Sequence, residues 1–424
     1  MGREALGDPT FEISVRTYRR WESGRPGWPR PDYVDALRAA FDAAPEDLGF
    51  THPPGQSASA TYLEGPVHRR ESVKLAALTV AMPGAVAAIL RQATDDAAEF
   101  TRQAEATTLG SGTLDHLDHA IATFNGAYSI QPPHALFETV LHYRRHVGAL
   151  LGGRYTLRQG RELYAFAGWL SELLAWLAHD LGDARAGLAF ATDAFVHGFE
   201  AGHGELCAWA TDASASISLY SLRPDKALAA AEKGLSQSPT GHPLTVRLHA
   251  QAARAGAALG DPRRFAVSLR AAEEAHRVLP ARVRTRFGMD PMPLGDYALM
   301  SYPATACIWL GQAEKARAYA EHALQTYVAA PEASRSPSRE AIARIDLAMA
   351  HAQLGELDDA VAFGREALQS TRVVDSVRSR ADGLASYLER RYPRDLAGEQ
   401  FREELRVLQA MPQPELTALQ GVSP

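Results

Sequence analysis

Cysteine, lysine and net positive charge are all scarce in this 424-residue sequence, and each shortage narrows what the protein can be. Its two cysteines, Cys207 and Cys307, share no motif spacing, which excludes a disulfide framework or a cysteine zinc site and indicates reduced, buried thiols in a cytoplasmic protein. The net charge is −6, so any nucleic-acid surface must be local. Only four of the 44 basic residues are lysines, and alanine is abundant, which hints at a GC-rich bacterial genome.

Long apolar runs of membrane-spanning length are also missing. Residues 68–90 combine twin arginines with a 16-residue uncharged run, a pattern that is typical of an export signal. The segment is internal, the run is shorter than the roughly 20 residues that a bilayer requires, and Pro83-Gly84 interrupts it. We therefore expect a pair of buried helices here and no membrane partner.

The chain has three parts of different character. Residues 1–50 form a small arginine-bearing segment, and residues 51–64 form a linker that is rich in proline, serine and small residues. Residues 65–424 show a helical period almost throughout, and we find no convincing strand alternation. The sequence therefore predicts an all-α fold.

Five helical hairpins repeat along the third part. Each has a turn residue, then a triplet of mostly small residues spaced four and three apart, with an alanine twelve residues before the triplet. Small residues let two antiparallel helices approach closely, and glycine adopts the left-handed conformation that ends a helix. The triplets are Gly187/Ala191/Ala194, Ala227/Ala231/Gly234, Phe265/Leu269/Ala272, Ala316/Ala320/Ala323 and Ala360/Gly364/Ala367; the turn residues are Gly182, Leu222, Gly260, Gly311 and Gly355; the alanines are Ala175, Ala215, Ala253, Ala304 and Ala348.

This pattern resembles tetratricopeptide repeats, most closely at residues 341–370. One hairpin cannot bury its apolar face alone, so the resemblance implies an α-solenoid of stacked hairpins. Successive triplets are 40, 38, 51 and 44 residues apart, whereas the family repeats every 34, and inserted loops such as 330–340 account for some of the difference.

Residues 13–31, "ISVRTYRRWESGRPGWPRP", carry five arginines and one acid. Ser14 is placed to cap a helix that ends at Gly24, with Tyr18 and Trp21 on its inner face. A second amphipathic helix starts at Pro31. This order resembles the second half of a Cro/repressor-type (XRE-like) helix-turn-helix domain, in which the first of these helices reads the major groove.

The resemblance implies DNA contacts at particular positions of this sequence. They are Ser14, Arg16, Thr17, Arg19 and Arg20. The family places two further helices before the reading helix, whereas only twelve residues, 1–12, precede it here. We therefore expect residues 1–50 to be a partial, N-terminally truncated domain, which a start codon assigned too far downstream would explain.

Catalytic and metal-binding patterns are weak. His116/His119 and His142/His146 have helical spacing without a nearby acid or cysteine in ligand geometry, so they are interpreted as polar helix residues and no metal is expected. No phosphate-binding "GxxxxGK[ST]" motif and no nucleophile–base set is evident. We expect neither an enzyme nor a cofactor.

A stripe on the first helix of each hairpin is predicted to face a concave groove. It lies six and three residues before the small alanine and one and four after it. Tryptophans with nearby charges suit a peptide or an amphipathic small molecule, although the tryptophans fit an ordinary core equally well. The stripe comprises Trp169, Glu172, Trp176, His179, Trp209, Asp212, Ser216, Leu219, Arg247, Arg254, Ser301, Thr305, Ile345 and Met349.

Both resemblances together imply a cytoplasmic bacterial regulator, of a kind frequent in actinobacteria. The expected function is DNA-binding transcriptional regulation. Duplex DNA is one expected partner, and a peptide, small molecule or protein in the groove is the other. The chain could also form a homodimer. The alternative is a protein-interaction scaffold that carries a non-functional remnant of a DNA-binding domain.

Overall fold

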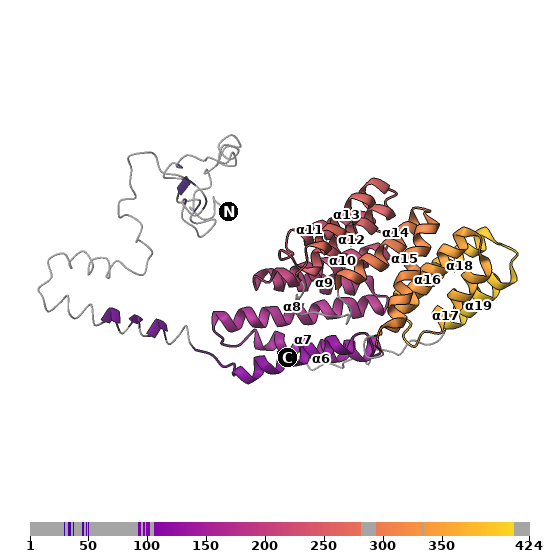
Figure 1. Cartoon of the computed structure of the whole chain (residues 1–424). Helices are drawn as coiled ribbons and strands as arrows, with labels where there is room; N and C mark the ends of the chain where they lie inside the picture. Colours follow the sequence, from indigo (N-terminus) through magenta and orange to yellow (C-terminus); the bar gives the residue numbers. More distant parts are fainter. Residues whose placement is uncertain are drawn as a thin grey trace, which may run out of the picture. The chain divides into compact units, whose positions relative to one another are not determined.

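The computed structural model describes residues 106–280, 294–331 and 335–410, with isolated positions between 29 and 101. The chain divides into two compact units, Met1–Glu99 and Phe100–Pro424. The helices labelled in Figure 1 all belong to the second unit. The predicted linker, 51–64, and the segment 68–90 lie outside the described residues.

The second unit is an all-α solenoid, as the sequence predicts, and the described residues include no strand. Helices follow one another and pack mainly against their neighbours in the chain (Figure 1). Their bounds are α6 Ser111–Ala127, α7 Pro133–Leu150, α8 Leu157–Asp180, α9 Ala184–Glu200, α10 Gly204–Tyr220, α11 Pro224–Leu235, α12 Pro243–Ala258, α13 Pro262–Arg277, α14 Leu294–Trp309, α15 Ala313–Ala329, α16 Pro337–Leu354, α17 Leu357–Leu368, α18 Asp375–Arg391 and α19 Leu396–Ala410.

The five predicted hairpins are α8–α9, α10–α11, α12–α13, α14–α15 and α16–α17. Four of their turns contain a glycine with φ between 66° and 89°, at Gly182, Gly260, Gly311 and Gly355. The second turn instead has Leu222 at φ 55°. Because side chains rarely adopt this conformation, Leu222 makes its turn the strained one.

Close helix packing explains the small triplets. All five predicted alanines and the glycines and alanines of the triplets are buried. A Cβ added to Gly234 on α11 would lie 2.3 Å from the Thr211 Oγ1 of α10, and one added to Gly187 on α9 would lie 2.9 Å from Ile217 Cδ1. A larger residue at either glycine would therefore require the neighbouring side chains to shift.

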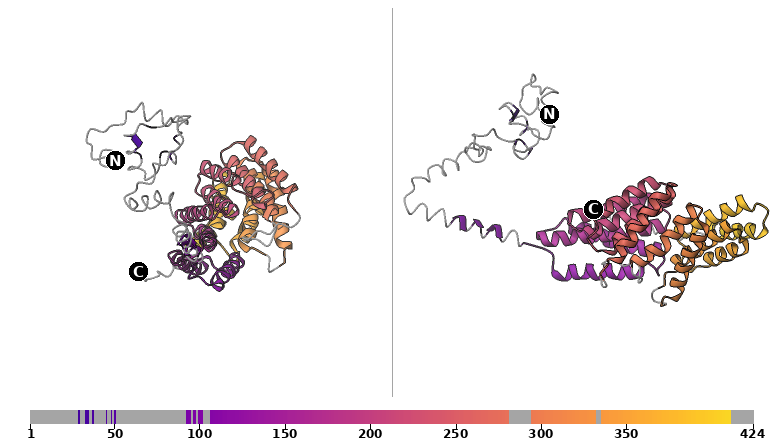
Figure 2. Two further views of the ribbon diagram at one scale, coloured as in Figure 1. Left: turned by 90° about the vertical axis from the view of Figure 1, so that its left-hand side faces the viewer. Right: turned by 45° about the horizontal axis from the view of Figure 1, so that its top comes forward.

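The stack curves until its late helices meet its early ones. In Figure 2, the two views show the hairpins winding from α6 towards α19. Helix α18 packs against α16 and also reaches α8, from the first hairpin. The described helices include none that is both long and apolar enough to cross a membrane.

Candidate functional site

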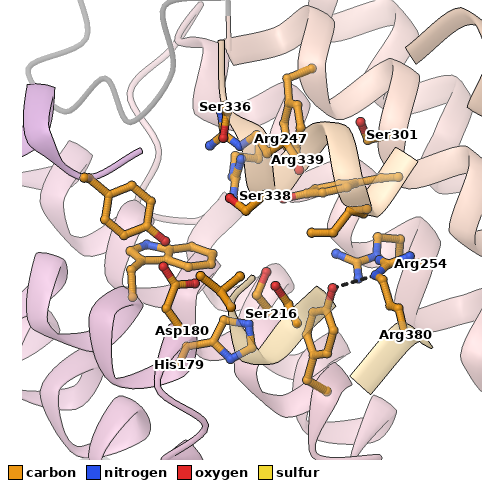
Figure 3. Close-up of a pocket in the computed structure, with 18 residues that line it drawn as sticks. His179, Asp180, Ser216, Arg247, Arg254, Ser301, Ser336, Ser338, Arg339 and Arg380 are labelled. Atoms are coloured by element: carbon orange, nitrogen blue, oxygen red, sulfur yellow. Dashed lines mark hydrogen bonds between the residues drawn. The ribbon is translucent and has the colours of Figure 1, made fainter. Parts of the chain in front are cut away.

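The inner surface of the second unit holds a cavity of about 70 Å³, called here the polar pocket. Its walls come from α8, α10, α12, α14, α16 and α18, so the first helix of every hairpin contributes. Four arginines line it against a single carboxylate, that of Asp180. Figure 3 shows its polar side chains, which are His179, Asp180, Ser216, Arg247, Arg254, Ser301, Ser336, Ser338, Arg339 and Arg380.

A chain of hydrogen bonds links α10 to α12 at this pocket. Arg247 Nε donates to Asp212 Oδ2 at 2.6 Å. Gln251 Nε2 donates to Asp212 Oδ1 at 3.1 Å and to Ser216 Oγ at 2.6 Å, and Arg254 Nη1 donates to Gln251 Oε1 at 3.1 Å. All five side chains are buried. Because buried hydrogen bonds of this kind are strong, the chain fixes the positions of both guanidinium groups.

Arg247 is held as a cation. Burial by itself would lower its pKa, but the Asp212 carboxylate raises that pKa above the ordinary value. Aromatic faces attract a desolvated cation. Four rings have centroids between 5.4 and 5.7 Å from the Arg247 Cζ, namely Trp176, Trp209, Tyr297 and Tyr302.

Arg254 differs because no described carboxylate lies within ion-pair distance of it, although its charge is among those that lower the pKa of Asp346, the partner of Arg380. Its side chain is only 3% exposed, and its Nε has no hydrogen-bond acceptor. The guanidinium lies 4.6 Å from the ring centroid of Tyr302 and 5.8 Å from that of Trp309. A buried charge without a counter-ion costs several kcal/mol. An anion bound from outside the chain would offset that cost.

Helix α18 brings a further arginine into the site. Arg380 forms an ion pair with Asp346 of α16. It also donates to Tyr220 Oη at 2.8 Å and to Thr305 Oγ1 at 3.0 Å. Thr305 in turn donates to Asp346 at 3.0 Å. Arg380 on α18 therefore contacts three helices from different hairpins, which are α10, α14 and α16.

A second ion pair closes the superhelix. Arg372 Nη2 donates to Asp180 Oδ2 at 2.8 Å, across 192 residues of sequence, and both side chains are buried. Arg372 also donates to Ser338 Oγ at 3.1 Å and to the carbonyl of Gln131 at 3.3 Å. We call this contact the Arg372–Asp180 clasp. It ties the segment between α17 and α18 to α8 and to the α6–α7 turn.

Glu172 lies beneath the polar pocket as a buried acid on α8. Burial raises the pKa of this carboxyl to about 8. Its Oε1 accepts a 2.8 Å hydrogen bond from Trp176 Nε1, whereas Oε2 has no partner. Glu172 is therefore largely protonated and uncharged at neutral pH.

A second cavity adjoins the first. This apolar pocket has a volume of about 250 Å³. Tyr220, Arg254 and Arg380 line both cavities, so the two are neighbours. The apolar pocket is lined by hydrophobic side chains, which are those of Leu219, Leu222, Ile308, Trp309, Ile345 and Met349.

The structure divides the predicted groove residues into two groups. The residues that line one of the two pockets are Trp176, His179, Ser216, Leu219, Arg247, Arg254, Ser301, Thr305, Ile345 and Met349. Trp169, Glu172, Trp209 and Asp212 lie below them and line neither. Trp169 and Trp209 belong to the main hydrophobic core, and Trp209 is 0% exposed. Of the two interpretations left open from sequence, Trp209 therefore fits the core, whereas Trp169, although buried, also lines a further cavity beside α6.

Several site residues were missed by the sequence analysis. Asp180, Arg339, Arg372 and Arg380 lie outside the predicted stripe, at a helix end, in a loop or on α18. Asp346 could have been found from sequence, because it is the one carboxylate in the largely apolar stretch "IARIDLAMAHA" of residues 342–352. A buried acid of this kind requires a partner.

The predicted DNA-binding residues, Ser14, Arg16, Thr17, Arg19 and Arg20, lie outside the described residues. Their role stays a prediction.

Among the described residues, one set of side chains has the spacing of metal ligands: His351, Glu356 and Asp359. His351 Nδ1 already shares a hydrogen bond with Glu356, which also pairs with Arg317. These contacts account for His351 and Glu356 as part of an ion-pair network at the α16–α17 turn. The histidine pairs considered from sequence, at 116/119 and 142/146, do not belong to it.

Comparison with known proteins assigns no family. No protein-family model matches the chain, and no curated protein is similar to it at a significant level.

Proposed function

We propose that the chain is a ligand-responsive, DNA-binding transcriptional regulator. In this proposal, the helical-repeat unit binds a peptide, a small molecule or a protein segment on its inner surface. The arginine-bearing segment at residues 13–31 contacts duplex DNA.

The observation that carries the ligand-binding half is the unpaired, buried guanidinium of Arg254 in the polar pocket. A chain under selection for stability alone would pair or replace such a charge, since an uncompensated buried ion is destabilising. Retaining it in a cavity is typical of a binding site that an anionic group completes. The hydrogen bonds described for three of its serines, Ser216, Ser301 and Ser338, go to Gln251, Tyr327 and Arg372 and not to a base, which favours binding over catalysis.

Binding of a ligand to the inner surface could also change the conformation of the helical-repeat unit. The polar pocket is walled by α8 at one end of the hairpin series and by α18 at the other. Two hydrogen-bonded contacts join the end of the series to the early helices: the Arg372–Asp180 clasp just before α18, and the contact of Arg380 on α18 with Tyr220 on α10. A ligand between these walls would bias the curvature of the superhelix, which is the differential contact that allosteric control requires.

The DNA-binding half rests on the sequence resemblance at residues 13–31. Arginine bonds guanine bidentately, so losing a base-reading arginine should cost roughly 1–3 kcal/mol at one base position. Losing a phosphate contact should weaken all sequences alike and reduce the salt dependence.

The test is genome-wide DNA crosslinking of the full-length protein and of Arg16→Ala, Arg19→Ala and Arg20→Ala, with Arg3→Ala as control. We expect enriched sites that the three variants lose and the control keeps. Absence of enriched sites would refute the regulator. If the protein then bound a specific protein partner through its repeat unit, we would conclude that it is an interaction scaffold and not a regulator.

A further inference from the structure

The two neighbouring cavities have complementary chemistry. The polar pocket supplies cations, and the apolar pocket supplies aliphatic and aromatic carbon. Arg254 lies at their junction, since it lines both. A molecule that occupied the apolar pocket would therefore present its inner end to a buried guanidinium.

The charges at this junction leave one cation available. Arg247 is neutralised by Asp212 and Arg380 by Asp346. The hydroxyl groups of Tyr220 and Thr305 are engaged with Arg380, and Thr305 also donates to Asp346. Arg254 keeps an Nε without an acceptor and has no carboxylate within ion-pair distance among the described residues. The site therefore matches one anionic group.

The volume of the apolar pocket limits the size of the rest of the ligand. Cavities of about 150 Å³ accept benzene. By proportion, about 250 Å³ accommodates roughly ten carbon atoms.

Leu222 gives an independent reason to expect an apolar occupant. It is the non-glycine residue with positive φ in the described chain, at 55°, and its side chain is 89% exposed at the pocket. The equivalent turns of the other four hairpins use glycine. A strained, solvent-exposed leucine has no stabilising role in the chain by itself, and such outliers point to function. Covering bound hydrocarbon would give this side chain a role.

We propose that the two pockets together bind one amphipathic molecule with a single anionic head, a carboxylate or a phosphate at Arg254, and an apolar tail of about ten carbons in the apolar pocket. The inference rests on the proposed ligand-binding function and narrows its ligand class. The head pairs with Arg254 through charge-assisted hydrogen bonds, and the tail packs on Ile308, Ile345 and Met349.

The probes are decanoate, decyl phosphate, 1-decanol and decyltrimethylammonium, each titrated into the full chain below its micellar concentration. Calorimetry gives affinity and stoichiometry, and Trp309 in the apolar pocket supplies a fluorescence signal. We expect saturable binding of one decanoate or decyl phosphate per chain, at least about tenfold tighter than the alcohol or the cation. Whichever anion binds more tightly identifies the head group.

Two variants and one matched control locate the site. Arg254→Met should weaken anion binding by about 10–100-fold without lowering the melting temperature, because it removes an unpaired buried charge. Gly383→Leu should fill the apolar pocket and abolish binding. A Cβ at Gly383 meets nothing within 4 Å, so the helix should fold normally. Gly126→Leu is the control, an exposed helical glycine on α6 with equal room and no pocket.

Three results would overturn the inference: no binding of either anion, equal affinity for decanol and decanoate, or unchanged binding by Gly383→Leu. The proposed function fails separately. Enriched DNA sites without amphiphile binding refute only this inference, whereas amphiphile binding without enriched DNA sites refutes only the DNA-binding half of the proposed function.

Discussion

Replacing Glu172 with glutamine should change how the stability of the protein depends on pH. Glutamine keeps the shape of the side chain and an oxygen that accepts the hydrogen bond from Trp176. It cannot ionise. The variant therefore isolates the cost of placing a carboxylate at this buried position, next to Asp212, which raises the Glu172 pKa, and Arg247, which lowers it.

The expected magnitude follows from the two pKa values. The carboxyl of Glu172 has a pKa of about 8 in the folded chain, compared with 4.5 when the group is exposed to water. Between these values the folded chain holds a proton that the unfolded chain has lost. The free energy of unfolding then falls by about 1.4 kcal/mol per pH unit. The contribution is fully present below pH 4.5, is lost as the pH rises, and is gone above about pH 8.

The assay is urea unfolding of the wild type and of Glu172→Gln at pH 5, 6, 7 and 8. Relative to the wild type, the variant should gain stability with each step, by roughly 3–4 kcal/mol in total between pH 5 and pH 8. Glu200→Gln, on the exposed face of α9, controls for the loss of a carboxyl group. A difference between variant and wild type that stays constant within about 0.5 kcal/mol over this range would refute the reasoning.

Two further substitutions test the packing of the site. Trp209→Ala should destabilise the fold by about 3–5 kcal/mol in urea unfolding, because it empties a fully buried aromatic site. The control is the same substitution at Trp309, which is partly exposed. A loss near zero for Trp209→Ala would show that this ring faces a ligand and not the core. Asp180→Asn should cost about 3–5 kcal/mol by leaving Arg372 buried without its carboxylate, and adding Arg372→Met should restore part of that loss. Equal stability of the single and double variants would show that the clasp does not couple the two side chains.

The hairpins were predictable because local chemistry determines them. Glycine at 182, 260, 311 and 355 is required by a left-handed turn, and small triplets are required where two helices approach closely. The 3.6-residue period then places the stripe on one face of each first helix. That period is why Arg247 and Arg254 could be assigned to the inner surface from sequence alone.

Burial along that stripe was not predictable, because it depends on how far neighbouring hairpins overlap. Trp209 and Arg247 hold the same position in the pattern, six residues before the alanine, yet only Arg247 lines one of the two pockets. The same holds for Glu172, whose pKa is raised chiefly by burial in the folded chain.

The sequence by itself determined the repeating unit, its turns and the direction in which each helix presents its side chains, since all of these arise within about 40 residues. Only the tertiary structure decided which unit meets which. Arg372 reaches Asp180 across 192 residues, and Arg380 reaches Tyr220 across 160. The physical reason is that superhelical curvature accumulates as a small rotation at each hairpin interface. Uneven repeat spacing changes the total rotation. The residues that come into contact at the two ends therefore cannot be deduced from any local sequence pattern.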